Sequence, residues 1–195
     1  MNIIFFGPPG SGKATQSEML LKKYKLEYIS TGDILRDHIA KRTPQGVEAK
    51  ALIDKGQLVP DELVVQLLES KLTENKDANG FLFDGFPRTL VQAYILEGLL
   101  LKINTSLHTV IALDVPKEEL TRRLLNRAHI EGRSDDNEIV IQERFREYDN
   151  KTFPVIDFYK SRNMFIPIDG TGTETKIFER VENVIDGVVK ESSYN

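Results

Sequence analysis

Residues 7–13 read Gly-Pro-Pro-Gly-Ser-Gly-Lys and form the segment of this chain best suited to chemistry. Backbone N–H groups in a Gly-rich turn can converge on phosphate oxygens at the N-terminus of a helix. Gly10 and Gly12 let the backbone approach a phosphate closely, and Lys13 brings a positive charge to the β- and γ-phosphates. An apolar run precedes the loop and a helical pattern follows it, as such a loop requires. We therefore expect the loop to bind a nucleoside triphosphate.

The loop departs from the commonest pattern at one position. Ala14 follows Lys13, where many phosphate-binding loops carry a Ser or Thr that coordinates magnesium, and Thr15 comes one residue later. A guanine-reading Asn-Lys-x-Asp motif is also missing, because residues 75–78 read Asn-Lys-Asp-Ala. These two features argue against a switch GTPase.

A second group of polar residues lies between Asp84 and Gln92. Asp84 ends an apolar run, where a carboxylate can orient magnesium or its waters beside the loop. Arg88 follows a proline-stiffened turn, and Gln92 lies four residues later on the same helical face. A guanidinium fork suits a phosphate, and a glutamine amide offers a base edge both a donor and an acceptor. Together these residues predict a second nucleotide pocket.

Further arginines follow in the second half of the chain. Arg123 and Arg127 are four residues apart on one helical face, where like charges repel unless an anion lies between them. Two nucleotides placed face to face carry roughly five to six negative charges, which several arginines could offset. The chain is acidic overall, with a net charge of −4. The arginines that are candidates for offsetting the phosphate charges are Arg36, Arg88, Arg123, Arg127, Arg133 and Arg144.

Composition excludes several other classes of protein. Of the 195 residues 40% are hydrophobic and 29% charged, a balance typical of one globular domain. The absence of cysteine excludes disulfides, a thiolate zinc site and a cysteine nucleophile. No apolar run approaches the ~20 residues of a membrane-spanning helix, and the first apolar stretch is too short for a secretory signal. We expect a cytoplasmic protein that binds neither membranes nor nucleic acid.

The elements that must position these residues alternate between strands and helices. Apolar runs predict strands over residues 2–6, 81–83, 109–113 and 164–168, and helical patterns cover 13–24, 61–74, 90–101, 116–127, 138–160 and 174–189. Such alternation favours βαβ units and a parallel sheet with helices on both faces. Pro167 favours an edge position for the last strand, and Pro154 predicts a kink near Thr152.

Two segments stand apart from this pattern. Residues 30–59 read as helical but lack a strong apolar strand, which indicates an excursion from the sheet. Asp135-x-x-Glu138 resembles a capping box with Asp135 as the cap. Asp135 and Asp136 are thus expected either to form a hinge or helix cap or to take part in the chemistry.

Several motifs in the same order resemble adenylate kinases of the short-lid form across nearly the whole chain. They are GPPGSGK with Thr15-Gln16, Ser30–Asp33 with Leu35-Arg36, residues 56–61 (GQLVPD), residues 83–92 (FDGFPRTLVQ), Arg123 with Arg127, residues 132–136 (GRSDD), Arg144 and residues 169–171 (DGT). The resemblance implies an α/β P-loop kinase fold with a central parallel five-stranded sheet flanked by helices. It further implies a single kinase domain with a core of residues 1–29, 60–127 and 137–195, an AMP-binding helical insertion over 30–59 and a short lid over 128–136.

The resemblance also implies a role for each matching residue. The ATP-binding residues would be Gly10, Ser11, Gly12, Lys13, Ala14, Thr15, Arg123, Arg127 and Gly172, with Arg123 against the adenine. The AMP-binding residues would be Thr31, Arg36, Gln57, Leu58, Val59, Gly85, Phe86, Pro87, Arg88, Gln92, Arg133 and Arg144. The catalytic residues would be Lys13, Arg88, Arg127, Arg133 and Arg144, and Asp84 would hold Mg²⁺, through water.

The reaction that the resemblance implies is ATP + AMP ⇌ 2 ADP with magnesium, as a direct in-line transfer by a monomer. Phosphoryl transfer depends mainly on positioning and charge, so it needs no histidine or serine nucleophile. With no cysteines, the lid cannot carry the four-cysteine zinc site of some long-lid relatives, and no zinc is expected. Ala14 stands where these kinases usually have glycine.

Two other functions stay open at this point. Another nucleoside monophosphate kinase could use UMP, CMP or GMP as the acceptor. Pyrimidine-specific relatives tend to have alanine at the position of Thr31 and asparagine near Gln92, so these two residues favour a purine. A catalytically idle nucleotide-binding module would be expected to lack Lys13, Arg88 or the later arginines, and this chain keeps them.

Overall fold

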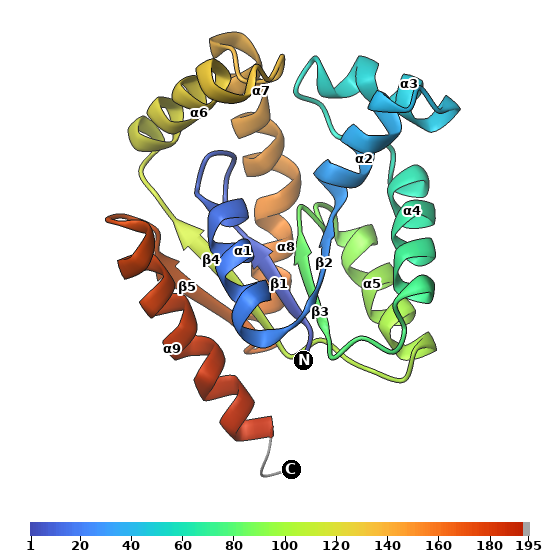
Figure 1. The fold of residues 1–195 in the computed structure, drawn as a ribbon, viewed down its shortest axis with the longest axis vertical. Coiled ribbons are helices and arrows are strands. Elements are labelled where there is room, and N and C mark those ends of the chain that lie inside the picture. The colour runs from blue at the N-terminus through green and yellow to red at the C-terminus, as the bar shows by residue number, and fades with distance from the viewer. Residues whose placement is uncertain (193–195) are drawn as a thin grey trace.

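Short apolar segments build a parallel five-stranded sheet at the centre of the molecule (Figure 1). In the computed structural model, which describes residues 1–192, the strands are β1 (Ile3–Phe6), β2 (Glu27–Ser30), β3 (Phe81–Asp84), β4 (Thr109–Asp114) and β5 (Phe165–Asp169). Their order is β2-β3-β1-β4-β5, and each neighbouring pair is parallel. The phosphate-binding loop therefore leaves the sheet at the end of its middle strand.

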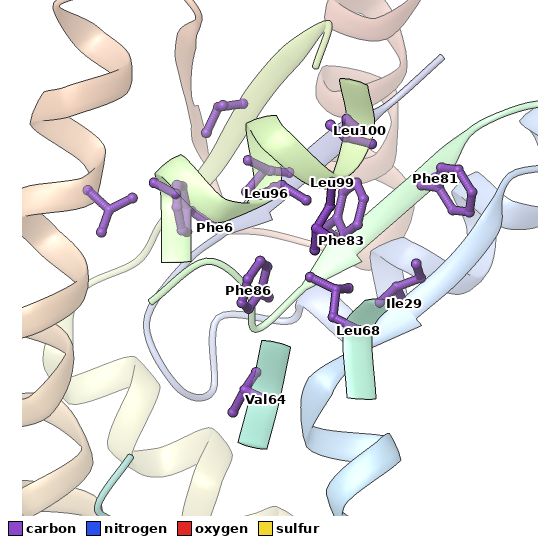
Figure 2. Close-up of a cluster of buried hydrophobic side chains, with 14 of the residues drawn as sticks. Phe6, Ile29, Val64, Leu68, Phe81, Phe83, Phe86, Leu96, Leu99 and Leu100 are labelled. Atoms are coloured by element: carbon purple, nitrogen blue, oxygen red, sulfur yellow. The ribbon is translucent and has the colours of Figure 1, made fainter. Parts of the chain in front are cut away.

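Consecutive residues of each strand point to opposite faces of the sheet and supply two separate cores. Phe6 and Phe83 face one core, which is covered by α4 (Asp61–Glu74), α5 (Leu90–Lys102) and α8 (Phe153–Lys160) and contains Leu68 and Leu96 (Figure 2). On the opposite face Phe5 packs beneath α1 (Lys13–Tyr24) and α9 (Glu174–Ser192). The sheet is thus buried on both faces, as parallel sheets require.

Two pairs of helices stand above the carboxyl ends of the strands, on either side of the phosphate-binding loop (Figure 1). One pair, α2 (Thr31–Ala40) and α3 (Pro44–Ile53), follows β2 directly. The other pair, α6 (Lys117–Glu131) and α7 (Glu138–Glu147), packs through its own small apolar cluster, which includes Leu124 and Phe145. No helix among the described residues is both long and apolar enough to cross a bilayer.

The structure confirms most of the expected elements. The four apolar runs all form strands, and β5, with Pro167, lies at the edge of the sheet. The long helix expected over residues 138–160 is interrupted by a π-helical turn, η1 (Tyr148–Thr152), immediately before Pro154. The excursion expected over residues 30–59 forms α2 and α3, while the first residues of the expected lid, 128–131, continue α6.

Two local expectations differ from the structure. The strand β2 escapes the apolar pattern because it reads Glu-Tyr-Ile-Ser and lies at an edge, where only Ile29 and Ser30 are buried. The capping box at Asp135 is wrong. Asn137 is the cap of α7, since its Oδ1 accepts a hydrogen bond from the backbone N–H of Val140 at 3.1 Å. Asn137 has the extended backbone that a cap needs, and it directly precedes the helix.

The buried side chain of Asn2 ties together three segments at the amino ends of the strands. Its Nδ2 donates to Thr105 Oγ1 at 2.8 Å and to the carbonyl of Ser106 at 2.7 Å. Its Oδ1 accepts from the backbone N–H of Phe81 at 3.0 Å, at the start of β3. The side chain thus joins β1 and β3 to the loop before β4.

We predict that Asn2→Ala destabilises the fold by about 2 kcal/mol, because it removes these hydrogen bonds and leaves buried polar groups without a partner. The free energy of unfolding in urea is the measurement. Asn126→Ala is the matched control, since Asn126 lies on the exposed surface of α6 and its replacement should be nearly neutral. An equal effect of the two substitutions would contradict the structural role of Asn2.

Candidate active site

The phosphate-binding loop connects β1 to α1 in a conformation that requires glycine. Gly10 and Gly12 have φ values of +82° and +94°, and a methyl group on Gly10 would lie 2.9 Å from the carbonyl oxygen of Leu120. Lys13 begins α1, and its Nζ donates to the carbonyl oxygens of Gly7 at 2.7 Å and Pro8 at 3.2 Å. The ammonium group therefore folds back over the loop, where its charge faces the space that phosphates would occupy.

The electrostatic surroundings of Lys13 are strongly cationic. Burial lowers the pKa of the Lys13 ammonium to about 8, the Asp84 carboxylate opposes this, and Arg88, Arg144 and Arg127 lower it further. Burial likewise lowers the pKa of Arg88 and of Arg144. Several partly buried positive charges thus share one region, and an anion bound there would relieve their repulsion.

One hollow of about 640 Å³ opens between α2, α3, α5 and the end of β3. Among the residues expected to bind a monophosphate, those that line it are Thr31, Arg36, Gln57, Leu58, Val59, Gly85, Arg88, Gln92 and Arg144. Three others lie elsewhere: Pro87 lines a neighbouring hollow, Phe86 is buried in the core, and Arg133 is on the lid. The first hollow is therefore lined by both apolar and polar side chains, among them three arginines and two glutamine amides.

Arg88 is fixed by backbone contacts at the mouth of this hollow. The carbonyl oxygen of Gly85 accepts from Arg88 Nε at 2.7 Å and from Thr31 Oγ1 at 2.8 Å. Gly85 has a φ of +75°, and a methyl group there would lie 2.8 Å from Arg88 Nη2, so a side chain would displace the arginine. Because Nε is already engaged, the two Nη groups remain as a fork for a phosphate.

A second hollow of about 550 Å³ joins the first to the phosphate-binding loop. Lys13 lies in its wall, and the residues common to both hollows are Gly56, Leu58, Gly85, Arg88 and Arg144. The arrangement places two arginines, Arg88 and Arg144, where the two hollows meet. Two nucleotides bound in this way would meet end to end through their phosphates.

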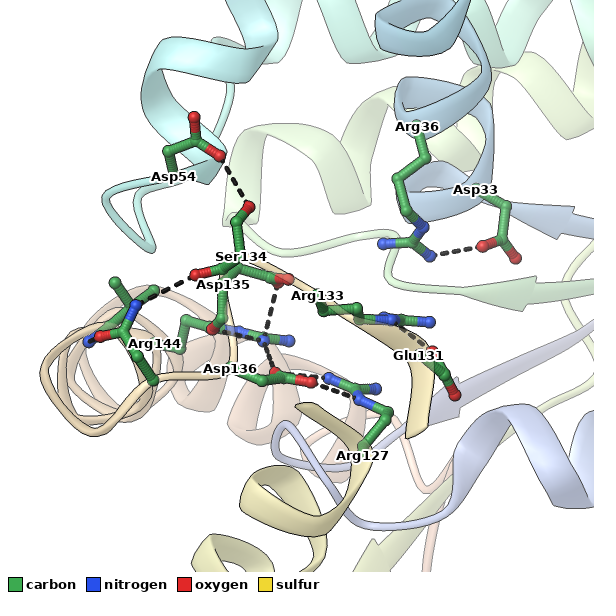
Figure 3. Close-up of polar contacts among 12 residues, drawn as sticks. Asp33, Arg36, Asp54, Arg127, Glu131, Arg133, Ser134, Asp135, Asp136 and Arg144 are labelled. Atoms are coloured by element: carbon green, nitrogen blue, oxygen red, sulfur yellow. Dashed lines mark hydrogen bonds and ion pairs between the residues drawn. The ribbon is translucent and has the colours of Figure 1, made fainter. Parts of the chain in front are cut away.

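Three arginines near the lid are held by carboxylates (Figure 3). Asp136, whose side chain is fully buried, accepts from Arg127 Nε at 2.6 Å and Nη2 at 2.8 Å, and from Arg144 Nη1 at 2.7 Å. Asp135 also accepts from Arg144 Nη1, at 2.8 Å. Arg133 pairs with Glu131 at 2.6 Å. Asp135 and Asp136 therefore position arginines rather than cap the following helix.

The lid touches the helical insertion across the site. Ser134 Oγ donates to Asp54 Oδ1 at 3.0 Å, just beyond α3 (Figure 3). Arg36 lies on the expected insertion, where it forms an ion pair with Asp33 of the same helix rather than with a residue of the lid. In this conformation the expected lid, residues 128–136, contacts the segment after α3, and its Asp135 lines the first hollow.

Arg123 lies on the other side of the phosphate-binding loop. It donates from Nη1 to the carbonyl of Ser11 at 3.3 Å and from Nη2 to the carbonyl of Gly170 at 3.2 Å, while Nε pairs with Glu119. It therefore joins the loop to the turn that contains Gly172. The side chain of Ala14 is exposed and that of Thr15 half-buried in the first turn of α1.

Asp84 is the candidate metal ligand, and one of its two carboxylate oxygens accepts a hydrogen bond from the protein. Its Oδ2 accepts from the hydroxyl of Tyr28 at 2.8 Å, at the end of β3 beside the loop. Within the described part of the chain no group of three or more acidic or histidine side chains could hold a metal ion. A lone carboxylate fits magnesium, which keeps several waters and takes its other ligands from substrate phosphates.

Sequence reasoning missed several residues that line or support the hollows. Glu147, Tyr148 and Thr152 line the second hollow, and their spacing of three, four and eight residues from Arg144 places them on its helical face. That spacing was a usable signal. Asp61, identified from the sequence only as a helix start, accepts hydrogen bonds from Thr89 and Gln92.

Known proteins were compared with the chain. The sequence model of the adenylate kinase family matches residues 5–164. An adenylate kinase of Leptospira biflexa serovar Patoc is 49% identical over 90% of this chain and 94% of its own length. The adenylate kinase of Parabacteroides distasonis is 45% identical over 96% of this chain and 99% of its own length. That of Thermus thermophilus is 44% identical over 92% of this chain and 94% of its own length. With a match over most of its length, the chain belongs to the adenylate kinase family of phosphotransferases.

Proposed function

We propose that the chain transfers the γ-phosphoryl group of Mg–ATP reversibly to AMP, giving two ADP. The observation that carries this proposal is the pair of adjoining hollows, with Lys13 in the wall of one, Gln92 in the wall of the other, and Arg88 and Arg144 common to both. A single nucleotide would leave one of these hollows without a ligand. Two nucleotides joined at their phosphates would use both.

ATP binds along the phosphate-binding loop in this proposal. The backbone N–H groups of residues 10–15 hold its phosphates at the N-terminus of α1, and Lys13 neutralises the β- and γ-phosphates. Arg123 packs against the adenine, whose other border is the backbone near Gly172. The contacts of Arg123 to both Ser11 and Gly170 support this assignment, because they place its guanidinium between the loop and that turn.

AMP binds in the hollow beneath α2 and α3. Arg88 and Arg36 hold its phosphate, and the backbone and side chains of residues 57–59 border the sugar and base. Gln92 binds the adenine edge, and Thr31 keeps Gly85 and Arg88 in place through the shared carbonyl. Phe86 supports this segment from the core, and Pro87 borders the second hollow beside Arg88.

Transfer then needs stabilisation of charge on the moving phosphoryl group more than a nucleophile. Lys13, Arg88, Arg127 and Arg144 supply positive charge from several directions, and Arg133 joins them from the lid. Asp84 would hold magnesium through water, and the metal would add positive charge beside the phosphates. Residues 30–59 act as the AMP-binding insertion and residues 128–136 as a short lid that excludes water, a competing acceptor.

We also propose that the protein acts as a monomer in the cytoplasm. Every residue assigned above comes from one chain, so the site does not need a partner subunit. ATP, AMP and ADP are the expected small-molecule partners, and neither nucleic acid nor a membrane has a role in this scheme.

The acceptor assignment is tested by following ADP formation from ATP with AMP, GMP, UMP and CMP in a coupled assay. We expect the highest kcat/KM with AMP. Fastest turnover with UMP or CMP would replace the adenylate assignment by a pyrimidine one. No turnover with any monophosphate would instead favour a nucleotide-binding module.

We predict that Arg88→Lys lowers kcat/KM for AMP by on the order of 100-fold, because a single ammonium cannot both contact Gly85 and present a fork to phosphate. Steady-state kinetics with varied AMP provide the measurement. Arg146→Lys is the control, since Arg146 is 72% exposed and, within residues 1–192, its ion pair is with Glu143. A loss with Arg88→Lys no larger than with Arg146→Lys would remove Arg88 from the proposed phosphate site.

The lowered pKa of Lys13 predicts a pH dependence of ATP binding. In the free enzyme Lys13 loses its proton as the pH rises through about 8, so kcat/KM for Mg–ATP should fall above that pH. Bound phosphates favour the charged ammonium and raise its pKa, so kcat at saturation should stay level to higher pH. Circular dichroism over the same range is the control for unfolding. A kcat/KM that falls no earlier than kcat would contradict this role.

A further inference from the structure

Asp61 lies behind the residue that is proposed to bind the base. It is the first residue of α4 and is half-buried. Its Oδ1 accepts from Gln92 Nε2 at 2.7 Å, and its Oδ2 accepts from Thr89 Oγ1 at 2.9 Å. Both oxygens of the carboxylate are therefore engaged by the segment that begins α5.

Gln92 is held at both ends of its amide. While Nε2 donates to Asp61, Oε1 accepts from the backbone N–H of Arg88 at 2.6 Å, and the residue is only 2% exposed. A half-turn of the amide would set Oε1 against the Asp61 carboxylate and Nε2 against the Arg88 N–H. Each contact would then join two acceptors or two donors, so the orientation of the amide is fixed twice.

The amide retains one donor and one acceptor for a ligand. A primary amide has two N–H groups and two lone pairs on oxygen, and the two protein contacts use one of each. Gln92 lines the hollow, so the remaining N–H and lone pair are those that a base can meet.

Fixing this orientation matters because purines differ at position 6. Adenine carries an amino donor there, beside ring nitrogens that accept, whereas guanine and hypoxanthine carry a carbonyl acceptor. On the N1 edge, hypoxanthine presents the reverse of the adenine pattern, so a freely turning glutamine could serve either base. A glutamine fixed in one orientation can serve only one of them.

We propose that Asp61 is a specificity-determining positioning residue, which holds the Gln92 amide in the orientation that accepts adenine and rejects 6-oxopurines. Asp61 itself touches no substrate in this scheme. The proposal rests on the proposed function, because it takes Gln92 as the group that meets the acceptor base.

The test compares AMP with inosine monophosphate, which differs from AMP only in the 6-position and its adjoining N1 proton. In Asp61→Ala one of the two fixing contacts is lost, so the ratio of kcat/KM for AMP to that for inosine monophosphate should fall by about tenfold. Asp61→Asn keeps the shape and one oxygen acceptor without the charge, and its ratio should lie between those of Asp61→Ala and the unchanged protein.

Glu62→Ala is the matched control, because Glu62 is the exposed neighbouring carboxylate in the same turn of α4. It should leave the ratio unchanged, and KM for ATP should be unchanged in all variants. A merely structural role of Asp61 would lower kcat/KM for both monophosphates by the same factor. An unchanged ratio in Asp61→Ala would therefore overturn the proposal, and Asp61→Asn decides the matter if the alanine variant does not fold.

Failure of this inference is separable from failure of the proposed function. If the unchanged protein phosphorylates AMP but the substitutions at Asp61 leave discrimination intact, only the role of Asp61 is wrong. If the unchanged protein does not phosphorylate AMP, the proposed function is wrong, and the inference falls with it.

Discussion

The structure depends on holding several partly buried cations close together. Lys13, Arg88 and Arg144 are partly buried, burial lowers the pKa of each, and Arg88 and Arg144 lower the pKa of Lys13 further. A folded chain tolerates such a group only when each charge is hydrogen-bonded or paired. The carbonyls of the phosphate-binding loop and of Gly85, and the carboxylates of Asp135 and Asp136, meet that requirement. These acceptors come from segments far apart in the chain, so the fold must bring those segments together.

The parallel sheet brings those segments to one edge. The middle strand β1 delivers the glycine loop, and its neighbour β3 delivers Asp84 and the Gly85–Arg88 turn. Buried strands with apolar side chains on both faces are rigid supports, which suits groups that must face phosphates at hydrogen-bond distances. The two helical pairs add arginines and carboxylates from above the strand ends, where Arg127 and Arg144 meet Asp136.

How much the sequence could predict depended on whether the information is local. Lys13 with its glycines, and Arg88 with Gln92, lie in short segments, so these two groupings could be anticipated, although Arg88 precedes α5 and does not share a helical face with Gln92. The apolar runs predicted four strands for the same reason. The strand β2 has too few apolar residues to be detected, and its pairing with β3 is a tertiary contact. Asp135 was misread because a carboxylate before a helix is usually a cap. Asp135 instead accepts from Arg144, which the turn between α6 and α7 brings near.

The carboxylates around the arginines can support binding of phosphate instead of competing with it. A guanidinium has five N–H groups, and Arg144 uses only its Nη1 amino group for Asp135 and Asp136. Arg88 uses only Nε for its side-chain contact to Gly85. The remaining donors of each fork keep a defined direction because the engaged ones anchor the plane. A phosphate can therefore bind without displacing the carboxylates, and little side-chain entropy is lost when it does. The same reasoning extends to Gln92, where Asp61 and the Arg88 backbone engage one donor and one acceptor and thereby aim the other two. In each case a contact within the protein sets the direction in which the same side chain can bind a nucleotide.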